Sequence, residues 1–389
     1  MSIGGTSTSS TKIRRDVSPR TILCVFGTRP EAIKMAPVVR ALAARPDDFR
    51  PIVCVTNQHQ EMLDQVLDLF ELRAEHSLHV MTSGQTPTDV AMRVLERLPP
   101  VLASTRPAAV LVQGDTTTTF AAALAAFYAR VPVGHVEAGL RTYRRDSPFP
   151  EELNRQMTTV LADWHYAPTD WSRDNLLRAG VAPEAITVTG NPVTDALQWI
   201  ADKVGDGMTV VPALRPSARM ILVTAHRREN FGAPFVEMCE ALRALVERNP
   251  DVELVYPVHL NPNVQEPVRR ILAGLARVHL LAPVDYATLV SLLKRCELVL
   301  TDSGGIQEEA PSLGKPVLVM RDTTERPEGI RAGTAKLVGT DRARILAETE
   351  RLLRDPAAYA AMAHAHNPYG DGHAGECIAN TLAAALNAT

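Results

Sequence analysis

The sequence has few of the features that mark secreted, metal-binding or membrane proteins. Its 389 residues include only five cysteines, which stand singly, several within short apolar runs such as Ile22–Phe26. Isolated cysteines of this kind are typical of small core residues in a reducing compartment, so we expect neither disulfide bridges nor thiolate ligands. The sequence has no His-Glu-x-x-His motif, no Asp-x-Asp pair and no cysteine pair at metal spacing. No bound metal is therefore expected.

Net charge and long apolar stretches are lacking as well. The formal net charge is only -3, which gives no reason to expect nucleic acid as a partner. No apolar stretch approaches the roughly 20 residues that a membrane helix needs. The first nineteen residues are rich in Ser and Thr, and the apolar run after Arg14-Arg15 soon breaks at Gly27. We interpret residues 1–19 as a disordered tail and expect a cytoplasmic protein without an export signal.

Short apolar runs alternate with helical patterns along the rest of the chain. This rhythm predicts an α/β protein with parallel sheets covered by helices. So many strands in one open sheet would be unusual, and two Rossmann-like domains of about five to seven strands with a central cleft fit better. The predicted strands are Ile22–Phe26, Pro51–Val55, Ala109–Val112, Val131–His135, Ile186–Thr189, Ile221–Thr224, Val252–Tyr256, Val278–Leu281, Leu298–Thr301 and Val317–Met320.

Breaks in this pattern predict the domain limits. The first break follows Gly190–Pro192, before a helical stretch over Thr194–Val204, and the second falls at Asn367–Gly372, before a terminal helix over Ile378–Leu386. We predict a first domain of residues 20–192, a second Rossmann-like domain of residues 193–369, and a segment 370–389 that packs back on the first. In such a pair, ligands bind in the cleft at the carboxyl ends of the strands.

A glycine pair follows the predicted strand Leu298–Thr301 and opens a helix. Ser303 and the glycines after it offer a hydroxyl, free N–H groups and no Cβ, as an anion site requires. Glu308 and Glu309 follow in the first turn, where carboxylates suit the helix dipole or accept hydrogen bonds from the hydroxyls of a ribose. The alternative is an ordinary helix capped by Ser303.

Cations surround the helix that follows the first predicted strand. Gly27 permits a sharp exit from the strand, Pro30 suits the first helical position, and Arg29 and Lys34 stand around the helix start. Positive charges there oppose the helix dipole unless an anion joins them. We interpret both as diphosphate ligands, the alternative being solvated surface charges.

Three carboxylates follow consecutive elements of the first half. Asp115 comes after the strand Ala109–Val112, Glu137 after the next strand, and Glu151 at the start of a helix. Asp115 could simply cap the helix over Phe120–Ala129. Taken together, the three acids form a constellation suited to proton transfer.

Polar loops also follow the strands of the second half. His226 directly follows the strand Ile221–Thr224 and is flanked by two arginines, which suits it to hold a phosphate or to protonate a leaving oxygen. His259 and Arg326 stand in two further loops after strands. Gly370–Gly375 matches the G-x-G-x-x-G motif of dinucleotide-binding sites, but no strand precedes it. We therefore expect no nicotinamide or other cofactor.

These motifs together closely resemble those of the non-hydrolysing UDP-N-acetylglucosamine 2-epimerases, from residue 21 to the end of the chain. The resemblance implies a two-domain glycosyltransferase B-type (GT-B) fold, a homodimer, and reversible conversion of UDP-N-acetylglucosamine (UDP-GlcNAc) to UDP-N-acetylmannosamine (UDP-ManNAc). The motifs that carry it are Gly27–Lys34, Gln58-His59, Gly114–Thr117, Val136–Arg141, Pro150–Arg155, Ala167–Trp171, His226–Asn230, Tyr256–His259, Asp302–Glu309 and Thr324–Pro327.

The resemblance also implies roles for individual residues. UDP would be held by Arg29, His226, Ser303, Gly304, Gly305 and Glu309. The sugar and the reacting bond would be surrounded by Lys34, Asp115, Glu137, Glu151, Arg155 and Arg326, and catalysis would fall to Asp115, Glu137, Glu151 and His226. Gln58 and His259 match a second, regulatory UDP-GlcNAc site, although Gln60 replaces the Arg that usually follows Gln-His.

The chemistry favours elimination over direct proton abstraction. The C2 hydrogen of the sugar is scarcely acidic until the C1–O bond to UDP breaks and C1 becomes oxocarbenium-like. A carboxylate would then take the proton, leaving 2-acetamidoglucal beside UDP, and reprotonation of C2 from the opposite face with return of UDP would give the epimer. Three alternatives stay open: a glycosyltransferase that uses a UDP-sugar, a hydrolysing 2-epimerase, and a non-catalytic nucleotide-sugar sensor.

Overall fold

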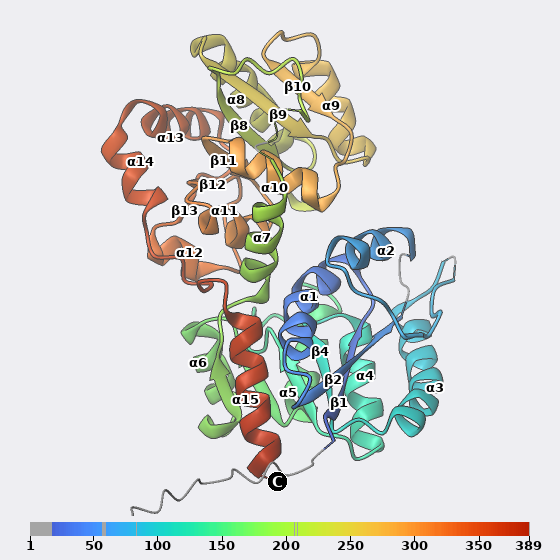
Figure 1. Ribbon diagram of the computed structural model, residues 1–389. Helices are drawn as coiled ribbons and strands as arrows, with labels where there is room; N and C mark the ends of the chain where they lie inside the picture. The colour runs from blue at the N-terminus through green and yellow to red at the C-terminus, as the bar shows by residue number, and fades with distance from the viewer. Residues whose placement is uncertain (1–17, 57–59, 83, 206, 208, 389) are drawn as a thin grey trace, which may run out of the picture.

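The computed structural model describes residues 18–56, 60–82, 84–205, 207 and 209–388. Most of the predicted tail, residues 1–17, lies outside these ranges. The described chain forms two parallel sheets of seven and six strands, each covered by helices and lying one above the other in Figure 1. The predicted α/β class with two Rossmann-like units is therefore confirmed.

The first sheet has the strand order β3-β2-β1-β4-β5-β6-β7. Every pairing in it is parallel, and β1 lies between β2 and β4. Its strands are β1 (Arg20–Phe26), β2 (Phe49–Val55), β3 (His76–Ser77), β4 (Ala109–Gln113), β5 (Val133–Val136), β6 (Trp164–Ala167) and β7 (Ile186–Val188). The helical segments between them are α1 (Arg29–Ala43), α2 (Gln60–Leu69), α3 (Pro87–Thr105), α4 (Thr117–Tyr128), α5 (Glu151–Leu161), α6 (Asp170–Arg178) and η1 (Pro183–Ala185).

The second sheet repeats this arrangement with the order β10-β9-β8-β11-β12-β13. Its strands are β8 (Arg219–Thr224), β9 (Val252–Pro257), β10 (Val278–Leu281), β11 (Leu298–Thr301), β12 (Val317–Val319) and β13 (Ala335–Leu337). The accompanying helical segments are α7 (Pro192–Lys203), η2 (Arg228–Asn230), α8 (Ala233–Arg248), α9 (Pro262–Leu272), α10 (Tyr286–Arg295), α11 (Ile306–Ser312), α12 (Pro327–Ala332), α13 (Arg342–Arg354), α14 (Pro356–Ala363) and α15 (Ala374–Ala388).

Every predicted strand coincides with an observed one, but three observed strands have no predicted counterpart. β3 and β13 are only two and three residues long, too short for an apolar run. β6 reads Trp-His-Tyr-Ala, with a buried histidine in place of an aliphatic residue. None of the three is a run of aliphatic residues, which is the pattern that predicted the other strands, although Trp164 and Tyr166 of β6 favour strands.

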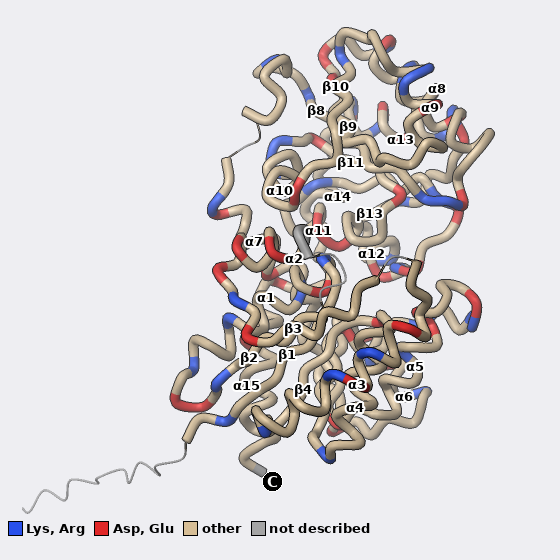
Figure 2. Tube along the Cα trace, turned by 90° about the vertical axis from the view of Figure 1, so that its right-hand side faces the viewer, with Lys and Arg blue, Asp and Glu red and all other residues tan. Residues whose placement is uncertain are grey.

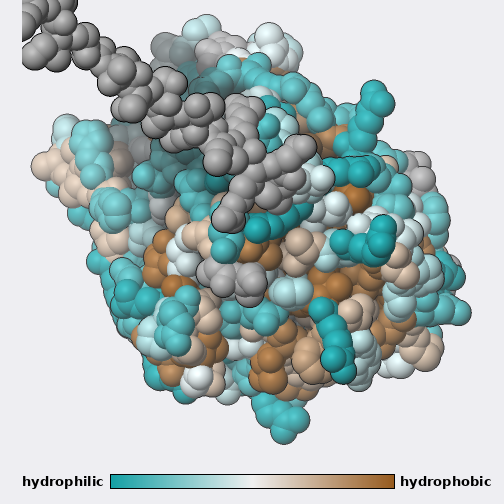
Figure 3. All heavy atoms as spheres, turned by 60° about the horizontal axis from the view of Figure 1, so that its bottom comes forward, coloured by the Kyte–Doolittle hydropathy of each residue, from teal (hydrophilic) through white to brown (hydrophobic). Residues whose placement is uncertain are grey.

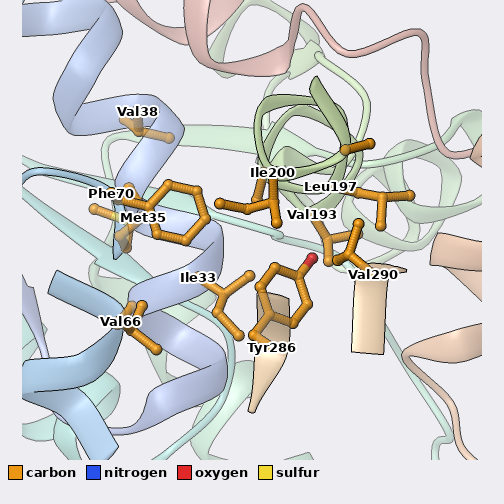
Figure 4. Close-up of a cluster of buried hydrophobic side chains, with 14 of the residues drawn as sticks. Ile33, Met35, Val38, Val66, Phe70, Val193, Leu197, Ile200, Tyr286 and Val290 are labelled. Atoms are coloured by element: carbon orange, nitrogen blue, oxygen red, sulfur yellow. The ribbon is translucent and has the colours of Figure 1, made fainter. Parts of the chain in front are cut away.

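Helix α7 joins the two halves. It packs against α1 and α15, which cover the first sheet, and against α10 and α11, which belong to the second. Figure 4 shows its apolar side chains between those of α1 and α10, in one cluster that includes Ile33, Met35, Val38, Val193, Leu197, Ile200, Tyr286 and Val290. The apolar core is therefore continuous from one half to the other.

The last helix, α15, crosses back towards the first half. It packs against α1 and α7 and buries Ile378, Leu382 and Leu386 (Figure 1). The domain limits given above stay predictions. Among the described residues, no helix is both long and apolar enough to span a membrane.

Candidate functional site

A buried carboxylate fixes the loop before α1. Glu31 is 3% exposed and accepts hydrogen bonds from the N–H groups of Gly27 (3.0 Å) and Thr28 (2.7 Å) and from the hydroxyl of Thr116 (2.7 Å). Thr28 caps the helix in return. These contacts join the turns after β1 and β4 and hold Arg29, the first residue of α1, at the mouth of the turn.

Gly27 serves this loop through close packing. Its conformation is open to other residues, but a Cβ there would overlap Thr56 Oγ1, at the end of β2. Glycine is therefore required at the turn after β1, as predicted. The reason is that no space is left for a side chain beside Thr56, and not that the backbone is in a conformation only glycine adopts.

The turn between β11 and α11 is built on its backbone. The N–H of Ser303 donates to Thr301 Oγ1 at 2.9 Å, and the N-cap residue of α11 is Gly305, which has no side chain to cap the helix. The alternative that Ser303 simply caps the helix is therefore wrong. A Cβ on Gly304 would lie 2.5 Å from Arg326 Nη1, so glycine is what allows that guanidinium to pack against the turn.

A second buried carboxylate fixes the turn after β8. Asp302 is fully buried and accepts the N–H groups of His226 (3.0 Å) and Arg227 (2.8 Å) and the amide of Asn230 (3.2 Å). The His226 ring stacks on that of His259, with centroids 5.2 Å apart and planes 17° from parallel. Burial lowers the pKa of His226, while the charge of Asp302 acts in the opposite direction.

These turns surround a cavity of about 410 Å³ between the two sheets. That volume lies within the range of small-molecule sites. Eight of the residues predicted from the sequence line it: Arg29, Lys34, His226, His259, Ser303, Gly305, Glu309 and Arg326. Figure 2 shows charged residues of both signs in this region between the halves.

Glu309 is the buried acid of this cavity. It is 6% exposed, and burial raises its pKa to about 7. The nearby Tyr286 hydroxyl lowers this pKa, and the neighbouring carboxylate of Glu308 raises it. Near neutral pH the side chain is therefore poised between its neutral and charged forms.

Lys34 connects the cavity to the acids of the first half. Its ammonium group pairs with Glu137, which is 7% exposed and also accepts hydrogen bonds from the amides of Gln113 and Asn191. Burial acts to raise the pKa of Glu137, but Lys34, with help from Arg326 and Asn191, holds that pKa below its usual value. Glu137 is therefore ionised at neutral pH.

Asp115 forms a second acid–cation pair beyond Glu137. Its carboxylate lies 2.8 Å from Arg155 Nη2. Thr116, and not Asp115, caps α4, so the alternative of a plain helix cap is wrong. Burial raises the pKa of Asp115, Arg155 lowers it, and the carboxylates of Glu137 and Glu151 raise it further.

Glu151 begins α5, as expected, and lines a separate cavity of about 320 Å³ together with Thr28 and Thr117. Its Oε2 atom is buried and has no hydrogen-bond partner among the residues that the structure describes. An unpaired buried carboxylate oxygen is unfavourable, which marks this position as one suited to a ligand.

The structure thus arranges the predicted residues in two groups. One group lines the larger cavity, and Lys34 joins it to the other, which contains Glu137, Asp115, Glu151 and Arg155. None of these four residues lines the larger cavity. Gln58, predicted for a regulatory site, lies outside the described residues.

Three buried residues that hold the site together were not among the predicted site residues. Glu31 and Asp302 lie inside the motifs already singled out, and Asn191 lies at the predicted domain junction. Glu308, considered from the sequence as a ribose ligand, is 1% exposed and pairs with Arg326. Their place in the motifs was visible, but their burial and their partners were not. Within the described ranges, no group of three or more His, Cys, Asp or Glu residues is placed to hold a metal ion.

The known proteins that this chain resembles in sequence carry the same name. Residues 40–383 match the family model described as UDP-N-acetylglucosamine 2-epimerase. The chain is 56% identical over 368 residues to the UDP-N-acetylglucosamine 2-epimerase of Escherichia coli strain K12, covering 93% of this chain and 98% of that protein. It is 48% identical over 372 residues to the protein of that name from Campylobacter jejuni, covering 93% and 97%.

Solved structures agree with these relatives. The crystal structure of the UDP-GlcNAc 2-epimerase from Neisseria meningitidis bound to UDP-GlcNAc matches with a TM-score of 0.86 and 47% identity, over 93% of this chain and 99% of that one. The enzyme from Methanocaldococcus jannaschii in complex with UDP-GlcNAc and UDP matches with a TM-score of 0.76 and 32% identity, over 93% and 99%.

Proposed function

The chain belongs to the UDP-N-acetylglucosamine 2-epimerase family, and we propose that it interconverts UDP-GlcNAc and UDP-ManNAc. The similarity extends over 93% of the chain, and a relative of the same fold binds UDP-GlcNAc. One observation within this chain carries the proposal further. Lys34 lines the large cavity and at the same time pairs with the ionised Glu137, so one side chain links the cavity to a candidate proton carrier.

The large cavity would hold UDP. Glu309 would accept hydrogen bonds from the ribose hydroxyls, which stabilise its ionised form. The diphosphate would lie at the turn Ser303–Gly305, between the guanidinium groups of Arg29 and Arg326. This assignment is supported by the lining of the cavity, which brings both arginines and the turn together. Cations and backbone N–H groups are the usual ligands of a diphosphate.

The first step would break the C1–O bond, and the bonding electron pair would leave with the diphosphate. Arg29, Arg326 and the turn at Ser303 would stabilise the growing negative charge, and His226 would stand beside the departing group. As C1 becomes electron-poor, the C2 hydrogen becomes acidic. A carboxylate takes that proton and a C1=C2 double bond forms, which gives 2-acetamidoglucal and UDP.

The return step needs a proton delivered to the opposite face of C2 while a diphosphate oxygen rejoins C1. Glu137, Asp115 and Glu151 are the candidate proton carriers. The differing surroundings of two of them support this division of labour: the pKa of Glu137 is lowered and that of Asp115 is raised. Such a pair suits one group to accept a proton while the other donates one.

Solvent exchange tests this function directly. UDP-GlcNAc is incubated with the purified protein alone in D₂O, and the products are followed by NMR and mass spectrometry. We expect UDP-ManNAc without any acceptor, deuterium at C2 in both epimers, and 2-acetamidoglucal with UDP as a minor species. Epimerisation without deuterium at C2 would contradict the elimination route.

The same experiment separates the alternatives. A hydrolysing epimerase would release free N-acetylmannosamine and UDP. A glycosyltransferase would leave UDP-GlcNAc unchanged until an acceptor was added. A sensor would bind UDP-GlcNAc without exchanging the C2 hydrogen.

His259 belongs to a possible regulatory site. It lies between the large cavity and a neighbouring one of about 360 Å³, which is also lined by His226, Arg227, Arg228 and Asn261. A second nucleotide sugar there would contact the loop that holds His226. Sigmoidal dependence of the rate on UDP-GlcNAc, lost in His259→Ala, would support this role, whereas hyperbolic kinetics in the wild type would contradict it.

A homodimer would use the apolar ends of α4 and α5. These helices pack side by side, and their last turns expose Phe127 (57%), Tyr128 (72%) and Val160 (85%). Figure 3 shows apolar surface between polar groups on the face at the bottom of Figure 1, the side away from the cavity. Light scattering on Val160→Asp tests this surface: a wild-type dimer that becomes a monomer supports it, and an unchanged dimer contradicts it.

A further inference from the structure

The side chain of Asn191 links carboxylates from the two halves. Its amide nitrogen donates to Glu137 Oε1 at 2.8 Å and to Glu308 Oε2 at 2.6 Å. Glu137 follows β5 in the first half, and Glu308 belongs to α11 in the second. Asn191 is 1% exposed. A primary amide has two N–H donors, so one group can serve both carboxylates at once.

The backbone around Asn191 is fixed from both sides. Its N–H donates to the carbonyl of Tyr369 at 2.7 Å, where the chain returns from the second half. Its Oδ1 atom accepts the N–H of Val193 and so caps α7, the helix that packs against both halves. The amide group therefore sits where the two halves meet, with little freedom to move.

The two carboxylates extend this link into the large cavity. Glu137 pairs with Lys34 and Glu308 pairs with Arg326, and both cations line the cavity. The result is a continuous chain of contacts from Lys34 through Glu137, Asn191 and Glu308 to Arg326. Two cations balance two anions, and the neutral amide stands between the anions.

Helix capping alone does not account for this arrangement. A cap needs only the Oδ1 atom, and aspartate caps a helix about as well as asparagine does. The amide nitrogen is the part that a cap does not require. An aspartate at this position would keep the cap but replace two donors by a third carboxylate.

We propose that Asn191 is a positioning residue of the epimerase: it holds Glu137 and Glu308 together across the halves, so that the proton-carrying acid and the diphosphate-binding Arg326 keep a fixed relative geometry. This inference rests on the proposed function. Loss of the amide donors would disturb both ends of the chain of contacts. A displaced Glu137 would slow proton transfer, and a displaced Arg326 would weaken UDP binding.

The pH profile should report the end at Glu137. That carboxylate faces charged or titratable groups from several elements: Lys34 on α1, Asp115 after β4, His135 on β5 and Arg326 before α12, with Glu308 across Asn191. The hydrogen bond from Asn191 lowers the pKa of Glu137. Removing that donor raises this pKa, so the acid limb of kcat against pH should move to higher pH.

The test compares Asn191→Asp with a matched change at another helix cap. Asp341 caps α13, on the exposed surface and away from the cavity, by accepting the N–H of Arg344 at 2.8 Å. We expect Asp341→Asn to keep wild-type kinetics. We expect Asn191→Asp to lower kcat on the order of 10- to 100-fold, to shift its acid limb upward, and to weaken UDP binding in calorimetry.

A swap variant separates the two ends. Asn191→Asp combined with Glu308→Gln keeps the net charge and lets an amide at position 308 donate to the new aspartate, while its oxygen still accepts from Arg326. We expect UDP affinity to recover and the shifted acid limb to remain, because the hydrogen bond that Asn191 donates to Glu137 is not restored and only the Gln113 amide still donates to it. Wild-type kcat, pH profile and UDP affinity in Asn191→Asp would overturn the proposal.

A second variant and a binding measurement cover the cases in which Asn191→Asp does not fold or the wild-type protein is inactive. If Asn191→Asp does not fold, Glu308→Gln alone is measured, since it removes one buried charge and keeps the shape. Unchanged kcat and unchanged UDP affinity in that variant would also overturn the proposal. If the wild-type protein shows no epimerisation, the proposed function is wrong, while UDP affinity in Asn191→Asp still tests the link to Arg326.

Discussion

The buried acids near the site have different partners in the two halves of the molecule. At the turns that line the cavity in the second half, Asp302 accepts the backbone N–H groups of His226 and Arg227, and Gly304 leaves room for Arg326, which pairs with Glu308. In the first half, Glu31 likewise accepts backbone N–H groups, but two candidate proton carriers pair with cations: Glu137 with Lys34 and Asp115 with Arg155. A rigid backbone surface suits the binding of an unchanging nucleotide, whereas paired acids suit a site where protons move.

The buried acids of the two halves show the same contrast in their pKa values. Glu309, in the second half, has no cation paired with it in the described structure, and burial raises its pKa to about 7. Glu137, in the first half, is equally enclosed, but Lys34 holds its pKa low. Burial alone therefore does not decide the charge of an acid here, because the partner decides it.

The largest effect is expected at the acids of the first half. Glu137→Gln, Asp115→Asn and Glu151→Gln should each lower kcat roughly 10²- to 10⁴-fold, because an amide cannot accept or return the C2 proton. UDP affinity, measured by calorimetry, should stay close to that of the wild type, since none of these acids lines the cavity proposed for UDP. If these variants bind UDP poorly, the division between the halves is wrong.

The next largest effect is expected for Glu309→Gln on the free energy of unfolding of the unliganded protein. The folded pKa of Glu309 lies above its ordinary value, so its protonation favours folding; this contribution is complete below about pH 4.5 and is lost as pH rises through about 7. Glu309→Gln should therefore be more stable than the wild type at pH 8 by up to about 3 kcal/mol, and by less than about 1 kcal/mol at pH 5. Urea denaturation at both pH values measures the difference.

A surface substitution serves as the control for this prediction. Glu184 is exposed, and Glu184→Gln should change the free energy of unfolding by the same small amount at both pH values. A gain for Glu309→Gln that does not depend on pH would show that the carboxyl of Glu309 does not titrate near neutrality.

Ligand binding gives a smaller effect at the same residue. Glu309→Ala should weaken UDP binding roughly tenfold to thirtyfold, because two hydrogen bonds to the ribose are lost. Inorganic pyrophosphate, which has no ribose, should bind the variant as it binds the wild type. Equal weakening of both ligands would move Glu309 from the ribose to the diphosphate.

The smallest effect distinguishes the two glycines of the turn before α11. A Cβ at position 304 meets Arg326 Nη1 at 2.5 Å, whereas at position 305 the nearest atom is Glu309 Oε2 at 3.5 Å, an ordinary contact. Gly304→Ala should lower the free energy of unfolding by about 1 kcal/mol, as mild overpacking does. Gly305→Ala should leave it nearly unchanged. Equal losses in denaturation would show that backbone freedom, and not the space for Arg326, requires both glycines.

Much of the fold was predictable because parallel strands buried on both faces are nearly continuous apolar runs. Ile22–Phe26 and Leu298–Thr301 are examples, and both lie in the interior of their sheets, with a strand on either side. The edge strand β13 and the short β3 carry no such signal. Edge strands bury less apolar surface, so their sequences are less constrained.

Many of the candidate site residues were predictable from a single rule, that ligands meet the carboxyl ends of parallel strands. Ser303, His226 and Arg29 follow strands in the sequence and line one cavity in the structure. The same rule could not predict that some acids lie outside that cavity. Asp115 follows a strand and Glu151 begins a helix, yet neither lines the cavity. Distances within the cleft depend on how the two halves pack.

The sequence by itself determined the α/β class, the two sheets and the motifs of a nucleotide-sugar enzyme, because strand burial and turn chemistry are local properties of the chain. Only the tertiary structure decided which charges meet. Lys34 and Glu137 are far apart in the chain, as are Asn191 and Glu308, and each pair is brought together by the packing of α1, α7 and α11. A side chain acquires its charge state from neighbours in space, and local sequence does not specify those neighbours.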